Sequence, residues 1–281
     1  MVDWSETYRG SVAPWECDIT EHFTIAYYFD RLEQASTEIA TVLGLSTRLK
    51  GGVFPRLFNL RFIRELRAGA GFHIESAAIG IDPALRLGHR FVDSATGEPV
   101  TWIAEVWEKT PLSGSEHNAV NSRLGLWEGP ELQSRPEPAS TVGSIATARG
   151  RIRPADLDEF ERLSLTAVVH RFTDGVLQAM AAVGITADYV KNERRGFSTF
   201  ELILRISSLP GVGDPYVVET GIAQLGSSSV RFLHRMIDPA EGKEFARLSQ
   251  FGVQLDLDAR RPAPLAEPIR AAAARLLLSS A

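Results

Sequence analysis

The sequence predicts an α+β protein of two tandem units, in each of which an antiparallel sheet of about five strands wraps one long central helix. Two observations carry this prediction. The chain of 281 residues repeats itself at a spacing of 140 to 145 residues, and each copy reads as a strand, one long helical pattern and then further strands. A composition of 44% apolar and 23% charged residues is that of a soluble globular protein, so each unit can form its own core.

The internal repeat is clearest in two places. The stretch Pro14–His22 recurs as Pro154–Arg162, with Pro, Asp and Glu at matching positions: Pro14/Pro154, Asp18/Asp158 and Glu21/Glu161. Further along, His89–Gly97 recurs as His234–Gly242. Because both matches occur in the same order, we interpret the chain as a duplicated module.

Each copy carries a helical pattern at the same place. Thr24 and Ser164 are N-cap residue types that precede it, and Gly44 and Gly184 stand where a helix-terminating glycine belongs. Apolar residues recur at spacings of three and four, which predicts one buried stripe per helix. The stripe residues are Tyr28, Leu32, Ala35, Ile39 and Val42 in the first copy and Val168, Phe172, Gly175, Ala179 and Ala182 in the second.

Strand-like runs follow each helix, and they are separated by turn-forming sequences such as Ser94–Glu98. The predicted strands are Leu57–Arg67, Phe72–Ile81, Leu85–Asp93 and Pro99–Glu108 in the first copy, and Ser198–Ser207, Tyr216–Gln224, Ser229–Asp238 and Phe245–Asp256 in the second.

The predicted domain organisation follows the repeat. Residues 1–128 form the first unit, 129–148 a linker, 149–262 the second unit and 263–281 a tail. The stretch Glu128–Thr141 holds three prolines and few apolar residues, so it is expected to act as a semi-rigid spacer. The Ala/Leu-rich run Ile269–Ser279 predicts a short helix that docks on the second unit.

Composition excludes several functional classes. With 30 Lys and Arg against 35 Asp and Glu, the net charge of −5 argues against a nucleic-acid-binding protein. The single cysteine, Cys17, excludes an intrachain disulfide framework and multi-cysteine metal sites. No run approaches the ~20 apolar residues of a membrane span, and the first residues do not resemble a signal peptide. The expectation is a cytoplasmic protein without a membrane partner.

The first copy carries a motif that resembles a known family. Asp18 is followed by His22 four residues later, by Tyr28 ten residues later and by Glu33-Gln-Ala35 on the predicted helix, with Arg64–Gly69 after the first strand that follows it. This pattern is similar to the 4-hydroxybenzoyl-CoA-thioesterase-like branch of the hotdog fold over residues 6–110, and it extends to 149–256 through the repeat. The resemblance implies a double hotdog that hydrolyses an acyl-CoA thioester to the free acid and CoA, without a cofactor.

The resemblance also implies roles for particular residues. Asp18 would be the catalytic carboxylate, either as nucleophile or as base for water, with His22 as an accessory and Glu33 as a second carboxylate. Backbone amides at the start of the helix would bind the oxyanion. Substrate contacts would come from Phe23, Thr24 and Tyr28, although Tyr28 also reads as a core residue. Each of these residues has an ordinary structural reading as well, since an Asp before a helix often forms a turn.

Departures from the family pattern leave alternatives open. Glu21 stands where the family usually has glycine, and in the second copy Arg162 replaces His22 and Thr173 replaces Glu33. One working site, around Asp18, is therefore expected. A hydratase or dehydratase of enoyl- or hydroxyacyl-CoA and a non-catalytic acyl-binding module are the other candidates, and a homodimer is possible.

Other reactive residues read as structural. His89 and His234 occupy equivalent strand positions and are expected to have structural roles, and no His and Glu spacing indicates a metal site. Cys17 has no paired histidine in the sequence pattern, so an inert thiol is expected.

Overall fold

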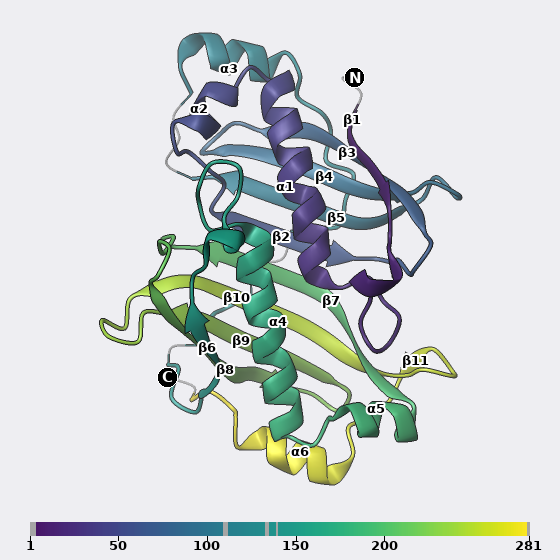
Figure 1. Ribbon diagram of the computed structural model, residues 1–281. Helices are drawn as coiled ribbons and strands as arrows, with labels where there is room; N and C mark the ends of the chain where they lie inside the picture. The colour runs from purple at the N-terminus through teal and green to yellow at the C-terminus, as the bar shows by residue number, and fades with distance from the viewer. Residues whose placement is uncertain (1–3, 109–111, 133–134, 139, 280–281) are drawn as a thin grey trace. The chain divides into compact units, whose positions relative to one another are not determined.

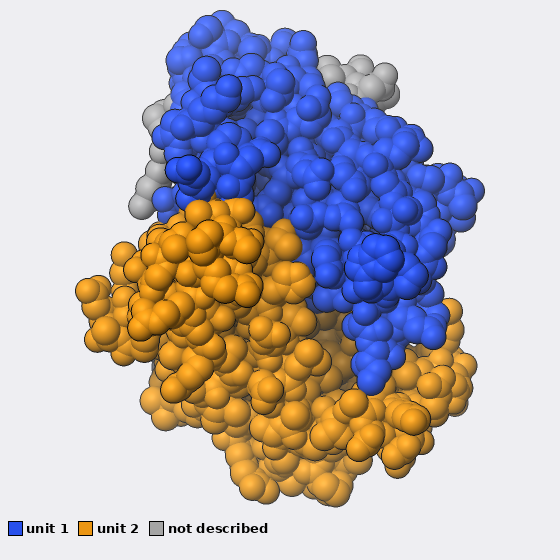
Figure 2. All heavy atoms as spheres, viewed as in Figure 1, with its two compact units in different colours: residues 1–132, 158–161 blue, residues 133–157, 162–281 orange. Residues whose placement is uncertain are grey.

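The computed structural model describes residues 4–108, 112–132, 135–138 and 140–279. The chain divides into two compact units, which Figure 2 shows in blue and orange. Unit 1 comprises Met1–Leu132 together with Asp158–Glu161, and unit 2 comprises Gln133–Leu157 and Arg162–Ala281. The four residues 158–161, which precede the second long helix, thus belong to the first unit.

Unit 1 has one long helix against an antiparallel sheet (Figure 1). Its sheet has the strand order β1-β3-β4-β5-β2. The strands are β1 (Ser5–Ser11), β2 (Leu57–Phe62), β3 (Gly71–Gly80), β4 (Leu85–Asp93) and β5 (Pro99–Trp107). The helices are the 3₁₀ turn η1 (Pro14–Glu16), the long α1 (Ile25–Val42) and the short α2 (Ser46–Lys50) and α3 (Gly114–Asn121).

Unit 2 repeats this plan (Figure 1). Its sheet has the order β7-β10-β9-β8-β6, and β11 pairs with β10. The strands are β6 (Ile145–Arg151), β7 (Arg195–Ile206), β8 (Pro215–Leu225), β9 (Ser229–Ile237), β10 (Glu244–Asp256) and β11 (Arg261–Pro262). The helices are η2 (Pro154–Asp156), the long α4 (Leu165–Ala182), α5 (Ala187–Glu193) and α6 (Glu267–Ala274). The predicted α+β class is confirmed.

The two long helices bury the faces that the apolar periodicity predicts, with one correction. Tyr28, Leu32, Ala35 and Ile39 are at most 2% exposed, but Ala182 is exposed and Val183, just after α4, is buried in its place. At Gly175 the helix comes so close to the sheet that an added Cβ would lie 3.0 Å from the Thr147 hydroxyl. Glycine at this position therefore permits the close packing of α4 on β6 and β8.

One strand ends earlier than predicted, and the difference shapes the candidate site. Strand β2 stops at Phe62, whereas the sequence predicts a strand up to Arg67. The following residues leave the sheet, and the backbone N–H of Phe23 donates to the carbonyl of Leu66 at 2.8 Å. A single β-bridge also joins His22 to Arg67. The connection after β2 thus lies against the segment that precedes α1.

The duplication includes a covering helix in each unit. The helices α3 and α6 have the same length, and the chain that follows each one pairs with the equivalent strand. The N–H of Gly125 donates to Ala78 of β3 at 2.8 Å, and the N–H of Leu278 donates to Ile222 of β8 at 2.9 Å. The C-terminal helix is therefore the counterpart of a helix in unit 1.

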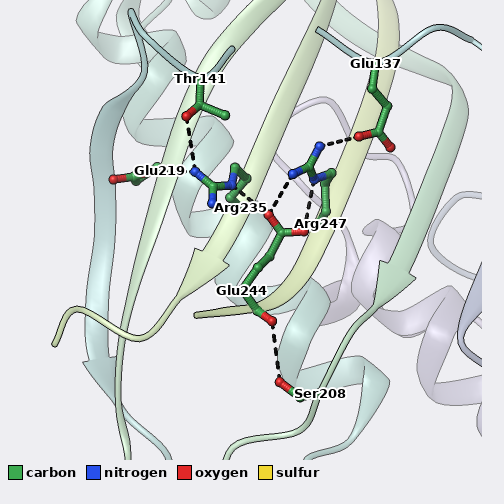
Figure 3. A network of polar contacts seen from close by, with 7 residues as sticks. All are labelled: Glu137, Thr141, Ser208, Glu219, Arg235, Glu244 and Arg247. Carbon is green, nitrogen blue, oxygen red and sulfur yellow. Dashed lines mark hydrogen bonds and ion pairs between the residues drawn. The ribbon is translucent and has the colours of Figure 1, made fainter. Parts of the chain in front are cut away.

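The proline-rich segment before β6 is held by arginines of β9 and β10, as Figure 3 shows. Arg235 donates to Thr141 at 3.2 Å, Arg231 donates to the carbonyl of Pro136 at 2.7 Å, and Arg247 pairs with Glu137. Burial would raise the pKa of Glu244, but hydrogen bonds from Arg247 and Arg235 outweigh it, so the pKa lies below its usual value. These contacts fix the path of the segment within unit 2.

Equivalent histidines lie in both cores. His89 and His234 are fully buried, and the Nδ1 of each lies within 2.8 Å of a hydroxyl, from Ser76 and Thr220 respectively. In unit 1, Glu105 is also fully buried, and its Oε1 accepts hydrogen bonds from Ser36 at 2.8 Å and from the Trp107 indole at 3.0 Å. Both histidines are thus part of the folded core.

Candidate active site

The segment before α1 forms a closed loop that is clamped to the helix. A β-bridge between Cys17 and Phe23 closes the loop, and the N–H of Thr24 donates to the carbonyl of Glu16 at 2.9 Å. The buried Glu16 carboxylate lies 2.5 Å from the Arg31 guanidinium of α1. A buried ion pair of this kind anchors the loop to the first turns of the helix.

Asp18 lies in this loop and organises it. Its Oδ1 accepts three hydrogen bonds: from the Thr20 hydroxyl at 2.6 Å, from the Thr20 N–H at 2.8 Å and from the His22 N–H at 3.1 Å. Its Oδ2 accepts none from the residues that the structure describes, and the residue is exposed. One oxygen of the carboxylate therefore fixes its orientation, and the other is left to meet water or a substrate.

His22 is engaged on both sides of its ring. Its Nδ1 lies 3.0 Å from the Thr20 hydroxyl, and its Nε2 lies 2.9 Å from Oε2 of Glu65. Glu65 comes from the connection after β2. Asp18, Thr20, His22 and Glu65 thus form a continuous chain of polar contacts.

Glu21 keeps the backbone conformation that the family's glycine would supply. Its φ is 64°, in the left-handed region, and Glu161 in the second copy has a φ of 59°. A non-glycine residue in this region costs of order 1 kcal/mol. The loop geometry therefore persists although the glycine is absent.

The Thr24 side chain does not cap the start of α1. The Thr24 side chain makes no capping hydrogen bond, whereas the Ser164 hydroxyl at the start of α4 accepts from the Ala167 N–H at 3.0 Å. The first amides of a helix and its dipole favour negative charge, so the start of α1 can stabilise an oxyanion.

The remaining residues expected at the site differ in burial. Phe23 and Tyr28 are 4% and 2% exposed, and their rings pack at a tilt with centroids 4.7 Å apart. Burial raises the pKa of Tyr28 well above its usual range. Glu33 lies half-buried on α1. The structure thus gathers Asp18 and His22 with Thr24 nearby, while Phe23 and Tyr28 pack in the aromatic core beneath.

Two other chemistries find no support among these residues. Burial raises the pKa of the Cys17 thiol, which disfavours the thiolate that a nucleophile needs. In the described part of the chain, no group of three His, Cys, Asp or Glu side chains is placed to hold a metal ion.

The second copy keeps the loop but changes its polar residues. Asp158 accepts from the Phe160 N–H at 2.9 Å, as Asp18 accepts from Thr20. Arg162 stands in place of His22, and the offset that relates Gly69 to Gly213 places Leu209 at the position of Glu65. The Thr37 hydroxyl of α1 donates to Glu159 at 3.4 Å, and Phe160 packs against the core around Ile39. The second loop therefore lacks the histidine and the acid, and it serves as part of the unit 1 core.

Comparisons with known proteins address the fold and the family. The profile of the Thioesterase-like superfamily matches residues 152–273. Among solved structures, a putative oleoyl thioesterase from Lactobacillus plantarum superposes with a TM-score of 0.69 at 14% identity, covering 94% of this chain and 98% of that one. The chain has the double-hotdog fold, and its residues 152–273 are similar to the Thioesterase-like superfamily.

Two further structures support the same fold. An acyl-ACP thioesterase from Bacteroides thetaiotaomicron has a TM-score of 0.65 at 9% identity, covering 87% of this chain and 96% of its own. A 12:0-ACP thioesterase from Umbellularia californica has a TM-score of 0.63 at 14% identity, covering 88% and 96%. No curated protein matches the sequence. The described helices include none that is long and apolar enough to span a membrane.

Sequence reasoning did not assign roles to Thr20 or Glu65. Thr20 lies within the quoted motif, and its side chain bonds the carboxylate two residues earlier, as hydroxyl residues in turns often do. Glu65 is 43 residues from His22 and meets it only through the fold. The internal repeat could have indicated this pairing, because His22 and Glu65 are both replaced in the second copy.

Proposed function

We propose that this double-hotdog protein hydrolyses an acyl-CoA thioester to the free acid and CoA at a site around Asp18. The observation that carries the proposal is the set of contacts of the exposed residue Asp18: its Oδ1 is held by three hydrogen bonds, while its Oδ2 accepts none from the described residues. A carboxylate oriented in this way can act without first rearranging.

The chemistry can follow either of two routes. In one, Asp18 Oδ2 takes a proton from a water molecule as its oxygen attacks the thioester carbonyl; the tetrahedral intermediate then breaks its C–S bond, and the CoA thiolate leaves and takes up the proton. In the other, Asp18 Oδ2 attacks the carbonyl carbon, the thiolate leaves, and water hydrolyses the mixed anhydride. Both routes develop an oxyanion, for which the amides at the start of α1 are the proposed donors. His22 assists Asp18, and Glu33 is proposed as a second carboxylate.

A carrier-protein thioester is a second candidate substrate. Two of the structures with the same fold are named as acyl-ACP thioesterases. The experiment must therefore compare CoA with acyl carrier protein as the thiol component of the substrate. The proposed substrate contacts, Phe23, Thr24 and Tyr28, would touch the acyl portion and are the same for both carriers.

The test is release of free thiol from acyl-CoA and acyl-ACP series of increasing chain length. We expect thiol release from acyl-CoA. With an enoyl thioester we expect no absorbance change from hydration of the double bond, and only the change that accompanies hydrolysis of the thioester. Thiol release from acyl-ACP but not from acyl-CoA would show that the substrate is the carrier-protein thioester. Hydration of the enoyl group without thiol release, or no reaction with any thioester, would refute hydrolysis.

A further inference from the structure

The contacts of His22 leave neither ring nitrogen open to a substrate. The His22 side chain is 13% exposed, and that of Glu65 is 27% exposed, so the contact between them is largely shielded from water. The Nδ1 faces Thr20 and the Nε2 faces Glu65, at 3.0 and 2.9 Å. For His22 to bind a carbonyl, one of these contacts would have to break.

Counting protons along the chain of contacts gives the direction of each hydrogen bond. The Thr20 hydroxyl has one proton and donates it to Asp18 Oδ1, so it must accept from His22 Nδ1. An ionised Glu65 carboxylate can only accept, so Nε2 also carries a proton. In this arrangement Nδ1 of His22 donates to Thr20 on one side and Nε2 donates to Glu65 on the other.

Several charged side chains lie near the contacts of His22. Glu65 contacts the ring directly, Asp18 contacts it through Thr20, and Glu21 lies 3.7 Å from Arg67. Arg67 opposes them, because its guanidinium approaches Nε2 at 3.4 Å, but it also lies 3.7 Å from Glu65. Glu65 is thus contacted from two sides, by His22 and by Arg67.

We infer that Glu65 is a positioning residue for the proposed hydrolysis: it holds His22 in place, His22 holds Thr20, and Thr20 fixes Asp18 Oδ1 so that Oδ2 faces the substrate. This inference rests on the proposed function. It also gives His22 a positioning role, which acts through Thr20 and does not require contact with the thioester. The second copy has neither His22 nor Glu65, which is consistent with one working site.

Glu65→Gln tests the inference by kinetics. The substitution keeps an oxygen that can accept from Nε2 but removes the charge, so we expect kcat to fall by about 10- to 100-fold with KM nearly unchanged. The matched control is Glu75→Gln, because Glu75 also lies beside a histidine, His73, at 3.8 Å, and its other contact is Arg90. The control is expected to keep wild-type kcat.

A double-mutant cycle shows whether Glu65 acts through the proposed chain. Thr20→Val removes the link between His22 and Asp18. If Glu65 works only through that link, adding Glu65→Gln to Thr20→Val lowers kcat no further. Additive losses would overturn the proposed route.

Nuclear magnetic resonance of ¹⁵N-labelled histidine gives a readout that does not depend on activity. Because Glu65 is the contact of Nε2, we expect the ring ¹⁵N resonances of His22 to differ between the wild type and Glu65→Gln. If Glu65→Gln fails to fold, Glu65→Asp keeps the charge and is expected to retain the wild-type ring resonances of His22 and most of kcat. An active wild type with unchanged kcat and ring resonances in Glu65→Gln would overturn this inference alone. An inactive wild type would refute the proposed function, and this inference with it.

Discussion

At the scale of residues, the two buried histidines show how the same position acquires different surroundings in the two copies. In unit 1, Nε2 of His89 lies 3.7 Å from Oε2 of Glu105, and both residues are fully buried. In unit 2, Gln250 stands at the position equivalent to Glu105 and donates to Thr199 at 2.7 Å. We therefore expect the stability of unit 1 to depend on the polar contacts of Glu105, for which unit 2 has no equivalent carboxylate.

Replacing Glu105 should reveal this dependence. Glu105→Ala leaves Ser36 and the Trp107 indole without their acceptor, so we expect a loss of about 3–5 kcal/mol in the free energy of unfolding. Glu105→Gln keeps an acceptor oxygen and should lose less. Urea unfolding of both variants measures the difference, and equal losses would contradict this account.

His234 predicts a pH dependence of stability. Burial lowers the pKa of His234 from its usual 6.5 to about 3. The unfolded chain therefore binds a proton that the folded chain does not, over the range between these values. The contribution of neutral His234 is fully present above pH 6.5 and is lost at about 1.4 kcal/mol per pH unit as the pH falls toward 3.

The measurement compares the wild type with His234→Leu. The free energy of unfolding of the wild type should fall more steeply than that of the variant between pH 6.5 and pH 4. Parallel curves over this range would show that His234 does not titrate as its burial predicts.

At the scale of elements, the starts of the two long helices differ in a way that mutagenesis can measure. Ser164→Ala removes the hydroxyl that accepts from the Ala167 N–H, so it should cost about 1 kcal/mol of stability. Thr24→Ala removes a side chain that makes no capping bond and should cost less. Thermal unfolding of the two variants checks the order, and a larger loss at Thr24 would contradict the capping geometry.

The order and type of the main elements could be predicted from the sequence because each has a local signal. The apolar stripes place both long helices, and the predicted strand Leu85–Asp93 has the bounds of β4. The end of β2 was missed because residues 63–67 continue the strand-like pattern, while in the fold they leave the sheet to meet the loop at His22. Ala182 was misplaced because the buried face turns to Val183 at the end of α4.

At the scale of the whole molecule, the two copies have kept different polar residues at the equivalent loops. Both copies keep the aspartate and the left-handed glutamate of the loop, as at Glu21 and Glu161. The first loop carries His22, which meets Glu65 from the connection after β2, whereas Phe160 of the second loop packs against the unit 1 core. The sequence predicted the repeat and the candidate aspartate, but the pairing of His22 with Glu65 depends on the path of the chain after β2.

The most direct test of the account compares Asp18→Asn with Asp158→Asn in the same thiol-release assay. These variants make one chemical change at equivalent positions of the two loops. We expect Asp18→Asn to lower kcat by about 100-fold or more, since the amide can neither accept a proton from water nor attack the carbonyl, and Asp158→Asn to retain wild-type activity. Wild-type turnover in Asp18→Asn, with both variants folded, would contradict the central claim.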